Sequence, residues 1–309
     1  MHGMTLTELK YIVAVAREKH FGRAAEACFV SQPTLSVAIK KLEEELDVKL
    51  FERGASEVSV TPLGDEIVRQ AQQVIEQAQA IREIAKRGKD PVSGPLRLGI
   101  IYTIGPYLLP DLVREAIAQV PQMPLMLQEN FTARLLEMLR TGELDCAIMA
   151  EPFPDTGLAV APLYDEPFLA AVPTAHPLAK RKSVTAEELK AETMLLLGTG
   201  HCFRDHVLEV CPEYARFSSN AEGIRKSFEG SSLETIKYMV ASGMGVTVLP
   251  SLSVPKELQP HIRFVKFAAP APTRRVVLAW RLSFPRHEAI AALRNCICAC
   301  ALPGVARLS

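Results

Sequence analysis

The sequence has no apolar run long enough to cross a membrane, and its first residues, Met1 to Thr5, hold no hydrophobic core of a signal peptide. It also has no internal repeat and no low-complexity segment. Its 35 basic and 35 acidic residues cancel, so binding to nucleic acid would depend on a local basic patch. These absences predict a cytoplasmic protein without a membrane partner, and they argue against a solute-binding transport protein.

Seven cysteines occur in a chain of 309 residues, whose 48% hydrophobic and 23% charged composition is ordinary for a globular protein. This length is enough for two or three globular units. Structural disulfides are rare in the cytoplasm. We therefore expect the cysteines to be thiols and any disulfide to be transient.

The amino-terminal part of the sequence predicts three helices. Apolar positions recur at helical spacing between Thr5 and Arg17, and residues 21–27 favour a short second helix. Ser31 is a favourable N-cap, and Pro33 is tolerated in the first turn of a helix. A third helix should therefore begin after Ser31 and run to about Leu46. One face of that helix carries small polar side chains and a lysine, which suit base edges and phosphates in a major groove. These residues are Gln32, Pro33, Ser36 and Lys40.

The segments 50–54 and 58–62 then predict a short hairpin, or wing, with Arg53 placed for phosphate or the minor groove. Helical periodicity alone would fit any three-helix unit with a solvated polar face. Four stretches are more specific, because together they resemble the winged helix-turn-helix of LysR-type transcriptional regulators. They are Phe21-Gly22-Arg23-Ala24-Ala25, Ser31-Gln32-Pro33-Thr34-Leu35-Ser36, Ile39-Lys40-Lys41-Leu42-Glu43 and Leu50-Phe51-Glu52-Arg53.

This resemblance covers about residues 5–65 and implies a fold and a partner. The partner is double-stranded DNA at promoter or operator sites. For the recognition helix the resemblance implies contacts from Ser31, Gln32, Pro33, Thr34, Ser36 and Lys40, and for the wing it implies a contact from Arg53.

A long linker helix should follow from Thr61-Pro62, since proline suits the first helical turn. Its apolar residues alternate four and three apart, as in a coiled coil: Ile67, Ala71, Val74, Ala78, Ile81 and Ala85. A single apolar stripe on a polar helix needs a partner surface. The helix's own domain could supply it, but a homodimer seam is favoured, since it would place two heads on a two-fold-related DNA site. Residues 86–95 predict a hinge.

The remaining sequence alternates strands and helices, which predicts a parallel α/β sheet. Strands are expected at 96–101, 125–128, 146–149, 168–172, 194–197 and 246–249, and helices at 106–119, 133–140 and 232–241. The chain should return to the first unit at 275–281 and end with a helix at 285–300. This order resembles the two-lobed, periplasmic-binding-protein-like effector domain of the LysR family, which takes a small molecule between its lobes.

The expected architecture is therefore an all-α winged helix-turn-helix, a long linker helix and an α/β two-lobed domain. We predict a DNA-binding domain at 4–61, a dimerisation helix and hinge at 62–90, and a regulatory domain at 91–309. Lobe I should comprise about 95–162 and 271–302, and lobe II about 163–270.

The stretch 199–211 carries the most distinctive chemistry of the chain. A glycine-rich turn precedes a helix expected from about Cys202, so the helix N-terminus points at that sulfur, and His201 and Arg204 add positive charge. These features favour the thiolate, which is the reactive form of cysteine. Cys211 lies nine residues further on, too far along a straight helix for the two sulfurs to meet. A disulfide between them would require local unwinding, which makes the pair a candidate redox switch.

Two other interpretations of this stretch stay open. Cysteines are often small buried apolar side chains. His201, Cys202, His206 and Cys211 are zinc-binding residue types, but their spacing matches no standard pairing of like ligands. We expect no metal and no cofactor.

Further segments resemble the hydrogen-peroxide-sensing subgroup of the LysR family, with the nine-residue separation of the two cysteines as the most specific mark. They are Gly105-Pro106-Tyr107-Leu108-Leu109-Pro110, Leu144-Asp145-Cys146, Asp165-Glu166-Pro167, Gly200-His201-Cys202-Phe203-Arg204-Asp205 and Ser232-Leu233-Glu234-Thr235. The resemblance implies that Cys202 is the peroxidatic thiol and Cys211 the resolving thiol.

The same resemblance places Thr103, Thr132, His201 and Asp205 around the peroxide. Arg274 is the best match for an arginine near the site, with Arg275 as the alternative. Threonine and histidine can donate hydrogen bonds to a leaving hydroxide. The competing interpretation of Thr132 is a cap for the helix expected from Ala133.

The resemblance implies a homo-oligomeric activator, a dimer of dimers, that controls oxidative-stress genes with RNA polymerase as a further partner and a cellular thiol as its reductant. The main alternative is a LysR regulator that binds a small organic effector between its lobes, with incidental cysteines. A thiol peroxidase enzyme is a second alternative, which the DNA-binding head disfavours.

The other five cysteines are predicted to be structural. Cys28 and Cys146 stand in apolar surroundings. Cys296, Cys298 and Cys300 are two residues apart on an expected helix, so neighbouring members point to different faces and a metal site is disfavoured.

Overall fold

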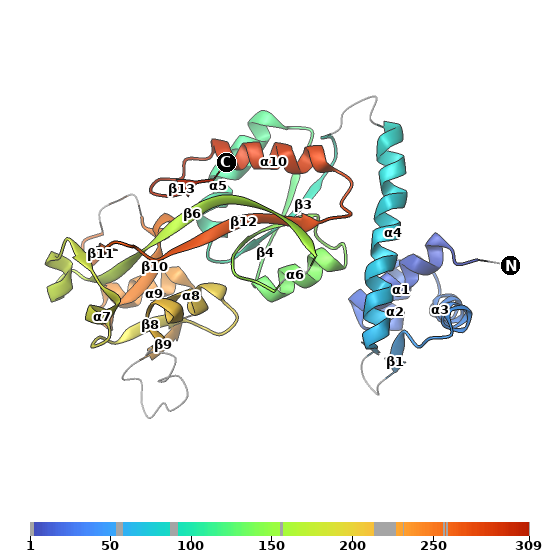
Figure 1. The fold of residues 1–309 in the computed structure, drawn as a ribbon, viewed down its shortest axis with the longest axis horizontal. Helices are drawn as coiled ribbons and strands as arrows, with labels where there is room; N and C mark the ends of the chain where they lie inside the picture. The colour runs from blue at the N-terminus through green and yellow to red at the C-terminus, as the bar shows by residue number, and fades with distance from the viewer. Residues whose placement is uncertain are drawn as a thin grey trace.

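The computed structural model describes residues 3–53, 58–86, 92–154, 157–212, 227–230, 232–255, 257 and 259–308, with the backbone alone for 53, 82–86 and 227–230. Figure 1 shows a small helical head, one long helix and a larger α/β body. Half of the predicted hinge, residues 87–91, lies outside the described residues. Within the described parts of the chain, no helix is both long and apolar enough to span a membrane.

The head consists of the predicted three helices and hairpin. Its elements are α1 (Leu6–Glu18), α2 (Phe21–Ala27), α3 (Gln32–Leu46), β1 (Phe51–Arg53) and β2 (Val58–Val60), with β1 and β2 antiparallel. Ser31 caps α3, as predicted, because its hydroxyl accepts a hydrogen bond from the Thr34 N–H, and Pro33 lies in the first turn, which needs no N–H donor there. The helix turns three apolar residues into the core of the head: Leu35, Ile39 and Leu42.

The long helix α4 (Pro62–Lys86) lies beside the head in Figure 1. The two parts of its predicted apolar stripe have different surroundings. Ala71 is buried in the core of the head and Ile67 packs against that core, so this part of the stripe is covered within the chain. Val74 is exposed, and Ile81 keeps 70% of its surface accessible. The first part of the stripe is thus packed on the head itself, and Val74 and Ile81 in the later turns stay exposed.

A buried polar network fastens the middle of α4 to the body. Arg281 donates through Nε to the Glu76 carboxylate and through Nη1 to the backbone oxygens of Leu139 and Leu144, the latter at 2.7 Å. The Ser283 hydroxyl donates to the same carboxylate. Glu76 is 2% exposed, so its charge is taken out of water and depends on these donors.

The part of the body nearest α4, which we call lobe I, is built on a mixed sheet. Its elements are β3 (Leu96–Ile101), α5 (Gly105–Gln119), β4 (Leu125–Asn130), α6 (Thr132–Arg140), β5 (Cys146–Ala150), β12 (Thr273–Arg281) and α10 (His287–Ala299). Strand β3 runs parallel to β4 and β5, as predicted, but β12 runs antiparallel to β5. The prediction of a parallel sheet is therefore wrong for the returning strand, because β12 re-enters the lobe from its far end.

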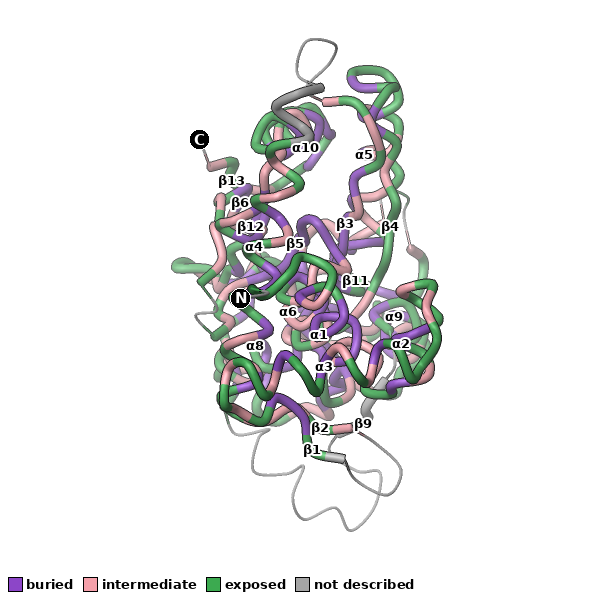
Figure 2. The backbone as a smooth tube through the Cα atoms, turned by 90° about the vertical axis from the view of Figure 1, so that its right-hand side faces the viewer, coloured by how far each residue is buried: buried purple, intermediate pink, exposed green. Residues whose placement is uncertain are grey.

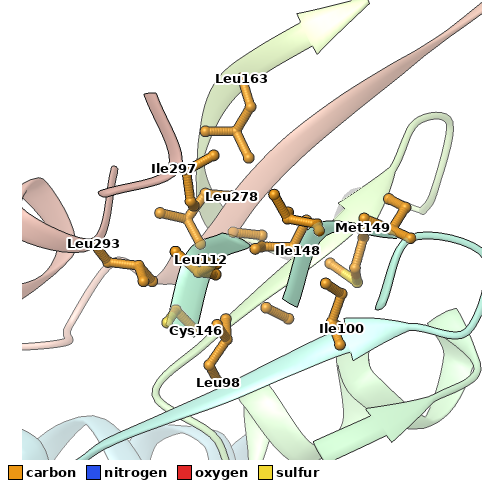
Figure 3. Close-up of a cluster of buried hydrophobic side chains, with 14 of the residues drawn as sticks. Leu98, Ile100, Leu112, Cys146, Ile148, Met149, Leu163, Leu278, Leu293 and Ile297 are labelled. Carbon is orange, nitrogen blue, oxygen red and sulfur yellow. The ribbon is translucent and has the colours of Figure 1, made fainter. Parts of the chain in front are cut away.

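Figure 3 shows the core of lobe I, where Leu98, Ile148 and Leu278 from three neighbouring strands meet Leu112 and Leu293 from the two covering helices. Every residue of β5 is buried, which explains its uninterrupted apolar sequence. By contrast, burial alternates along α5, which turns only one stripe inward (Figure 2).

Strand β6 (Leu158–Pro173) joins lobe I to the second half of the body, which we call lobe II. Its first part pairs antiparallel with β12 and with β13 (Ala306–Arg307), and its last part pairs antiparallel with β10 and β11. Leu163 belongs to the core of lobe I and Phe168 to that of lobe II. One sixteen-residue strand therefore crosses between the two cores, where only a strand at 168–172 was predicted.

Lobe II contains the remaining elements, packed around a separate core. They are η1 (Pro177–Lys180), β7 (Ser183–Val184), α7 (Ala186–Leu189), β8 (Met194–Leu197), α8 (Cys202–Val210), β9 (Ser227–Gly230), α9 (Leu233–Ala241), β10 (Thr247–Pro250), η3 (Ser251–Ser253) and β11 (Ile262–Phe267). The strand β8, fully buried, ends directly before the turn that leads into α8.

We expect Glu76→Ala to destabilise the protein, because it leaves the buried Arg281 without its carboxylate. The expected loss is about 3–5 kcal/mol in the free energy of unfolding, measured by guanidinium denaturation. Glu66→Ala is the matched control, since Glu66 is an exposed residue of the same helix. If the two variants unfolded at the same denaturant concentration, the Glu76–Arg281 pair would not stabilise the docking of α4.

Candidate functional site

The predicted switch helix begins at Cys202. The turn before it contains Gly200 at φ +100°, a conformation that favours glycine, and α8 runs from Cys202 to Val210. Cys202 is half-buried and packs against the core of lobe I, although α8 itself belongs to lobe II. The sulfur therefore lies at a helix N-terminus and at the contact between the two lobes.

A small cavity lies in front of Cys202. Lobe I lines it with Ile101, Tyr102, Thr103, Asn130, Phe131 and Thr132, and lobe II lines it with Gly200, His201 and Cys202. About 10 Å³ is open to the centre of a water-sized sphere, which leaves room for one very small polar molecule. The structure thus brings together four of the predicted site residues: Thr103, Thr132, His201 and Cys202.

Thr132 is the most informative residue of this cavity. It is the first residue of α6, so the N-cap position belongs to Phe131, whose side chain makes no capping bond. The Thr132 Oγ1 atom is buried and has no hydrogen-bond partner among the described residues. Such an atom is costly unless a partner arrives. The interpretation of Thr132 as a helix cap is therefore wrong, because the helix already begins at this residue and its hydroxyl caps nothing.

Thr103 is held by an arginine that crosses from β12. Arg274 donates through Nη1 to Thr103 Oγ1 at 2.8 Å and through Nη2 to its backbone oxygen at 3.0 Å. Because a guanidinium can only donate, the Thr103 oxygen accepts this bond and its own O–H stays able to donate. The buried carboxylate of Glu166 accepts from Nε and Nη2 of the same arginine at 2.9 and 2.8 Å, which balances its charge.

The neighbouring arginine is placed differently. Arg275 is exposed and pairs with Asp165 at 2.9 Å, so Arg274 and not Arg275 contacts the predicted site. Arg274 does not itself line the cavity but acts on it through Thr103. Asp205 is exposed on α8 and is also not among the lining residues.

His201 is held by two aromatic side chains that the sequence analysis did not single out. Its ring is 8% exposed and lies 4.8 Å from the ring of Phe131 and 5.9 Å from that of Tyr102, measured between centroids. Both aromatic residues directly adjoin predicted site residues in sequence, and that adjacency was the only signal available. They pack over the cavity and fix the imidazole beside Cys202.

Cys211 lies at the other end of α8 and is fully buried in the core of lobe II. Nine residues of α-helix correspond to roughly 13 Å of rise, whereas a disulfide joins Cα atoms less than about 7 Å apart. Both cysteines are thiols in the structure. The helix therefore keeps the two sulfurs apart in this structure.

Four of the other five cysteines fit the structural interpretation, and the exposed Cys298 does not. Cys146, Cys296 and Cys300 are buried in lobe I, and burial raises the pKa of each thiol, that of Cys300 to about 12. The half-buried Cys28 also has a raised pKa, mainly because of burial, and Cys298 is exposed. Among the described residues, no group of three or more His, Cys, Asp or Glu side chains is arranged to hold a metal ion.

The predicted DNA-contacting residues of α3 are accessible at the surface of the head. Gln32, Pro33, Thr34 and Lys40 are exposed on α3, and Ser36 is half-exposed beside them. Ser31 is engaged in the cap, where its hydroxyl lies 2.8 Å from that of Thr34. The backbone of Arg53 ends β1, and its side chain lies outside the described residues.

Comparison with known proteins gives matches over nearly the whole chain. The family described as "Bacterial regulatory helix-turn-helix protein, lysR family" matches residues 6–65, and the "LysR substrate binding domain" matches residues 89–299. The "DNA-binding transcriptional dual regulator OxyR" of Escherichia coli K12 is 39% identical over 292 residues, which cover 93% of this chain and 94% of that protein. A "Hydrogen peroxide-inducible genes activator" of Dickeya chrysanthemi shows the same identity and coverage.

Solved structures agree with these matches. A full-length OxyR from Pseudomonas aeruginosa, carrying a cysteine-to-aspartate substitution, is 51% identical, covers 97% of both chains and superimposes with a TM-score of 0.83. A cysteine-to-serine mutant of OxyR from Corynebacterium glutamicum in its H2O2-bound form is 32% identical, covers 96% of this chain and 92% of that chain, and has a TM-score of 0.63. The chain therefore belongs to the LysR family of bacterial regulatory helix-turn-helix proteins, in its OxyR group.

Proposed function

We propose that this chain is a transcription regulator, mainly an activator, that senses hydrogen peroxide through Cys202 and signals by a reversible Cys202–Cys211 disulfide. The observation that carries the proposal is the buried, unpartnered hydroxyl of Thr132 in a water-sized cavity that also exposes Cys202. It is supported by the similarity to a hydrogen peroxide-inducible genes activator and to an OxyR mutant with bound H2O2.

The chemistry has two steps and uses only this chain and peroxide. In the first, the Cys202 thiolate attacks one peroxide oxygen, an S–O bond forms, the O–O bond breaks, and the leaving hydroxide takes up a proton to become water. In the second, Cys211 attacks the sulfenic acid, an S–S bond forms, and water leaves. A cellular dithiol or two thiols would reverse the oxidation by reducing the disulfide.

The cavity is organised to stabilise the leaving oxygen. Thr132 presents a free hydroxyl, and Thr103 keeps its O–H available because Arg274 occupies its oxygen. His201 is fixed beside them by Tyr102 and Phe131. Donors held in place before the reaction stabilise developing negative charge without reorganisation, and this is the role we assign to them.

The size of the cavity argues against an organic effector at this position. Pockets for small organic ligands usually enclose about 300–1,000 Å³, whereas this one admits little more than a water molecule. A larger hollow of about 870 Å³ lies between the head, α4 and lobe I, away from Cys202 and outside the contact between the lobes. Peroxide is therefore favoured over the organic-effector alternative.

The output of the switch follows from the position of the two cysteines. Joining them requires α8 to lose its helical form, which would alter the contact between the lobes. We assign 4–61 to DNA binding, 62–90 to dimerisation and 91–309 to sensing, in a cytoplasmic homo-oligomer that contacts RNA polymerase. Oxidation would be stoichiometric, as in a sensor, with slow recycling by a thiol reductant, in contrast to a peroxidase.

A peptide mass map tests the proposed function directly. Reduced protein treated with about one equivalent of peroxide and quenched by alkylation should yield a linked Cys202–Cys211 peptide, because only these thiols are joined by the proposed route. The link should be absent from Cys202→Ser, whereas Cys298→Ser, which changes an exposed cysteine outside the site, should keep it. Alkylation of both Cys202 and Cys211 in the treated protein would contradict the proposal.

Thr132→Val should slow the reaction of Cys202 with peroxide by about ten- to a hundredfold, because it removes one positioned donor at nearly constant volume. The rate at which the free Cys202 thiol disappears would be measured at several peroxide concentrations, and its dependence on concentration gives the second-order rate constant. Thr174→Val is the control, since Thr174 is exposed in lobe II. Equal rates for both variants would exclude the Thr132 hydroxyl from the reaction.

Lys40→Ala should weaken DNA binding similarly for specific and random sequences, because a lysine on this face would contact phosphate. The slope of log affinity against log salt should become shallower by about 0.9 for each phosphate that the variant no longer neutralises. Lys182→Ala, at an exposed site of lobe II, should leave the slope unchanged. An unaltered slope for Lys40→Ala would remove this residue from the proposed interface.

A further inference from the structure

His206 has no part in the mechanism above, yet it lies one turn beyond Cys202 on α8. Its Nε2 atom is 2.7 Å from the backbone oxygen of Glu151. Glu151 follows β5 in lobe I, and its own N–H donates to the Arg275 oxygen of β12 at 2.9 Å. The hydrogen bond therefore ties the switch helix of lobe II to a fixed piece of lobe I backbone.

The surroundings of the imidazole determine its chemical form. A carbonyl oxygen only accepts, so Nε2 must carry the hydrogen, and Nδ1 is then an unprotonated nitrogen in the neutral ring. Nδ1 is buried without a hydrogen-bond partner among the described residues. The ring is 5% exposed and packs against Phe168 and Phe203, with centroid distances of 6.2 and 6.3 Å.

The charges that face the ring are mixed. Burial is the main cause that lowers the pKa of His206 below its ordinary value. Arg274 from β12 lowers it further, while the hydrogen bond to Glu151 and the carboxylates of Glu209 and Asp205 on α8 act in the opposite direction. The docked helix thus holds this histidine neutral.

We propose that His206 is a positioning residue that docks α8 on lobe I and thereby holds Cys202 in register with Thr103 and Thr132. The inference rests on the proposed peroxide chemistry, because the site is divided between the lobes. Cys202 and His206 are four residues apart on one helix, so they share a face and move together. The thiol supplies the reacting atom, and the imidazole supplies the contact that fixes the distance across the cavity.

A dependence on pH follows from the neutral form of the ring. A released helix would expose His206, whose pKa would return to about 6.5. With α8 docked, His206 binds its proton more weakly, because its pKa is lower than in the released helix. The contribution of His206 to docking is therefore complete above the pKa of the released state. It is lost as the pH falls through the lower pKa of the docked state. Acid should therefore favour the undocked helix.

The experiment compares three full-length variants with the wild type by the second-order rate of Cys202 oxidation by peroxide. His206→Leu removes the hydrogen bond, His206→Gln keeps an amide donor at the position of Nε2, and His261→Gln changes an exposed histidine of lobe II. At neutral pH we expect His206→Leu to be slower by about three- to tenfold, the effect of one hydrogen bond. His206→Gln and His261→Gln should stay close to the wild type.

The pH profile supplies a readout that a merely structural role would not move. The ionisation of Cys202 changes the rate with pH in the same way in the wild type and in each variant. This effect therefore cancels in the ratio of the wild-type rate to the variant rate. The ratio of wild type to His206→Gln should be constant above about pH 6.5 and fall below it, whereas the ratio of wild type to His261→Gln should stay level. This comparison holds even where His206→Leu fails to fold.

The outcomes separate the two proposals. A wild-type Cys202 that peroxide does not oxidise contradicts the proposed function itself. Oxidation of the wild type, with a flat ratio against His206→Gln across the pH range, overturns the role of His206 and leaves the peroxide chemistry standing. A His206→Leu variant that is folded and reacts at the wild-type rate overturns that role as well.

Discussion

The helical backbone of α8 is the constraint on which the proposed signal depends. It places Cys202 at its N-terminus and Cys211 beyond its last turn, so the reduced fold and the disulfide exclude one another. Cys211 also contributes to the core of lobe II, together with Phe203 and Val207. The proposed disulfide would therefore disrupt α8 and part of a hydrophobic core, and a change of this kind has two discrete states rather than a continuous range.

The cavity is assembled from two lobes that have separate cores, which makes its chemistry sensitive to how the lobes meet. Lobe I supplies the threonines and the aromatic residues, and lobe II supplies the thiol and the histidine. The buried Arg274–Glu166 pair stands at this contact, with the guanidinium 5.1 Å from the ring of Phe203 on α8. Buried charges are tolerated there because each nitrogen of the guanidinium donates to at least one acceptor.

Local signals in the sequence predicted the elements well and their long-range pairing less well. Ser31 and Pro33 fixed the start of α3 through capping chemistry, and the apolar run of β5 identified a buried strand. The antiparallel return of β12 depends on partners in β5 and β6 more than a hundred residues away, and the length of β6 also depends on partners in β10 and β11 at least 76 residues away, which no local pattern encodes.

The same contrast applies to the site. The two threonines, the histidine and the thiol could be named from the resemblance, but the start of α6 could not be located to a single residue. A shift of one residue in the start of α6 decides whether Thr132 caps the helix or lines the cavity.

Strand β12 connects the cavity with α4. It carries Arg274, which donates to Thr103, and seven residues later Arg281, which donates to Glu76 of α4. Strand β12 is paired with β6 from Thr273 to Arg281, with a shift of register between Val276 and Val277, and with β5 from Val276 to Trp280, so about 23 Å of paired strand separates the two arginines. One strand therefore contacts both the cavity, through Thr103, and the docked helix α4, through Glu76.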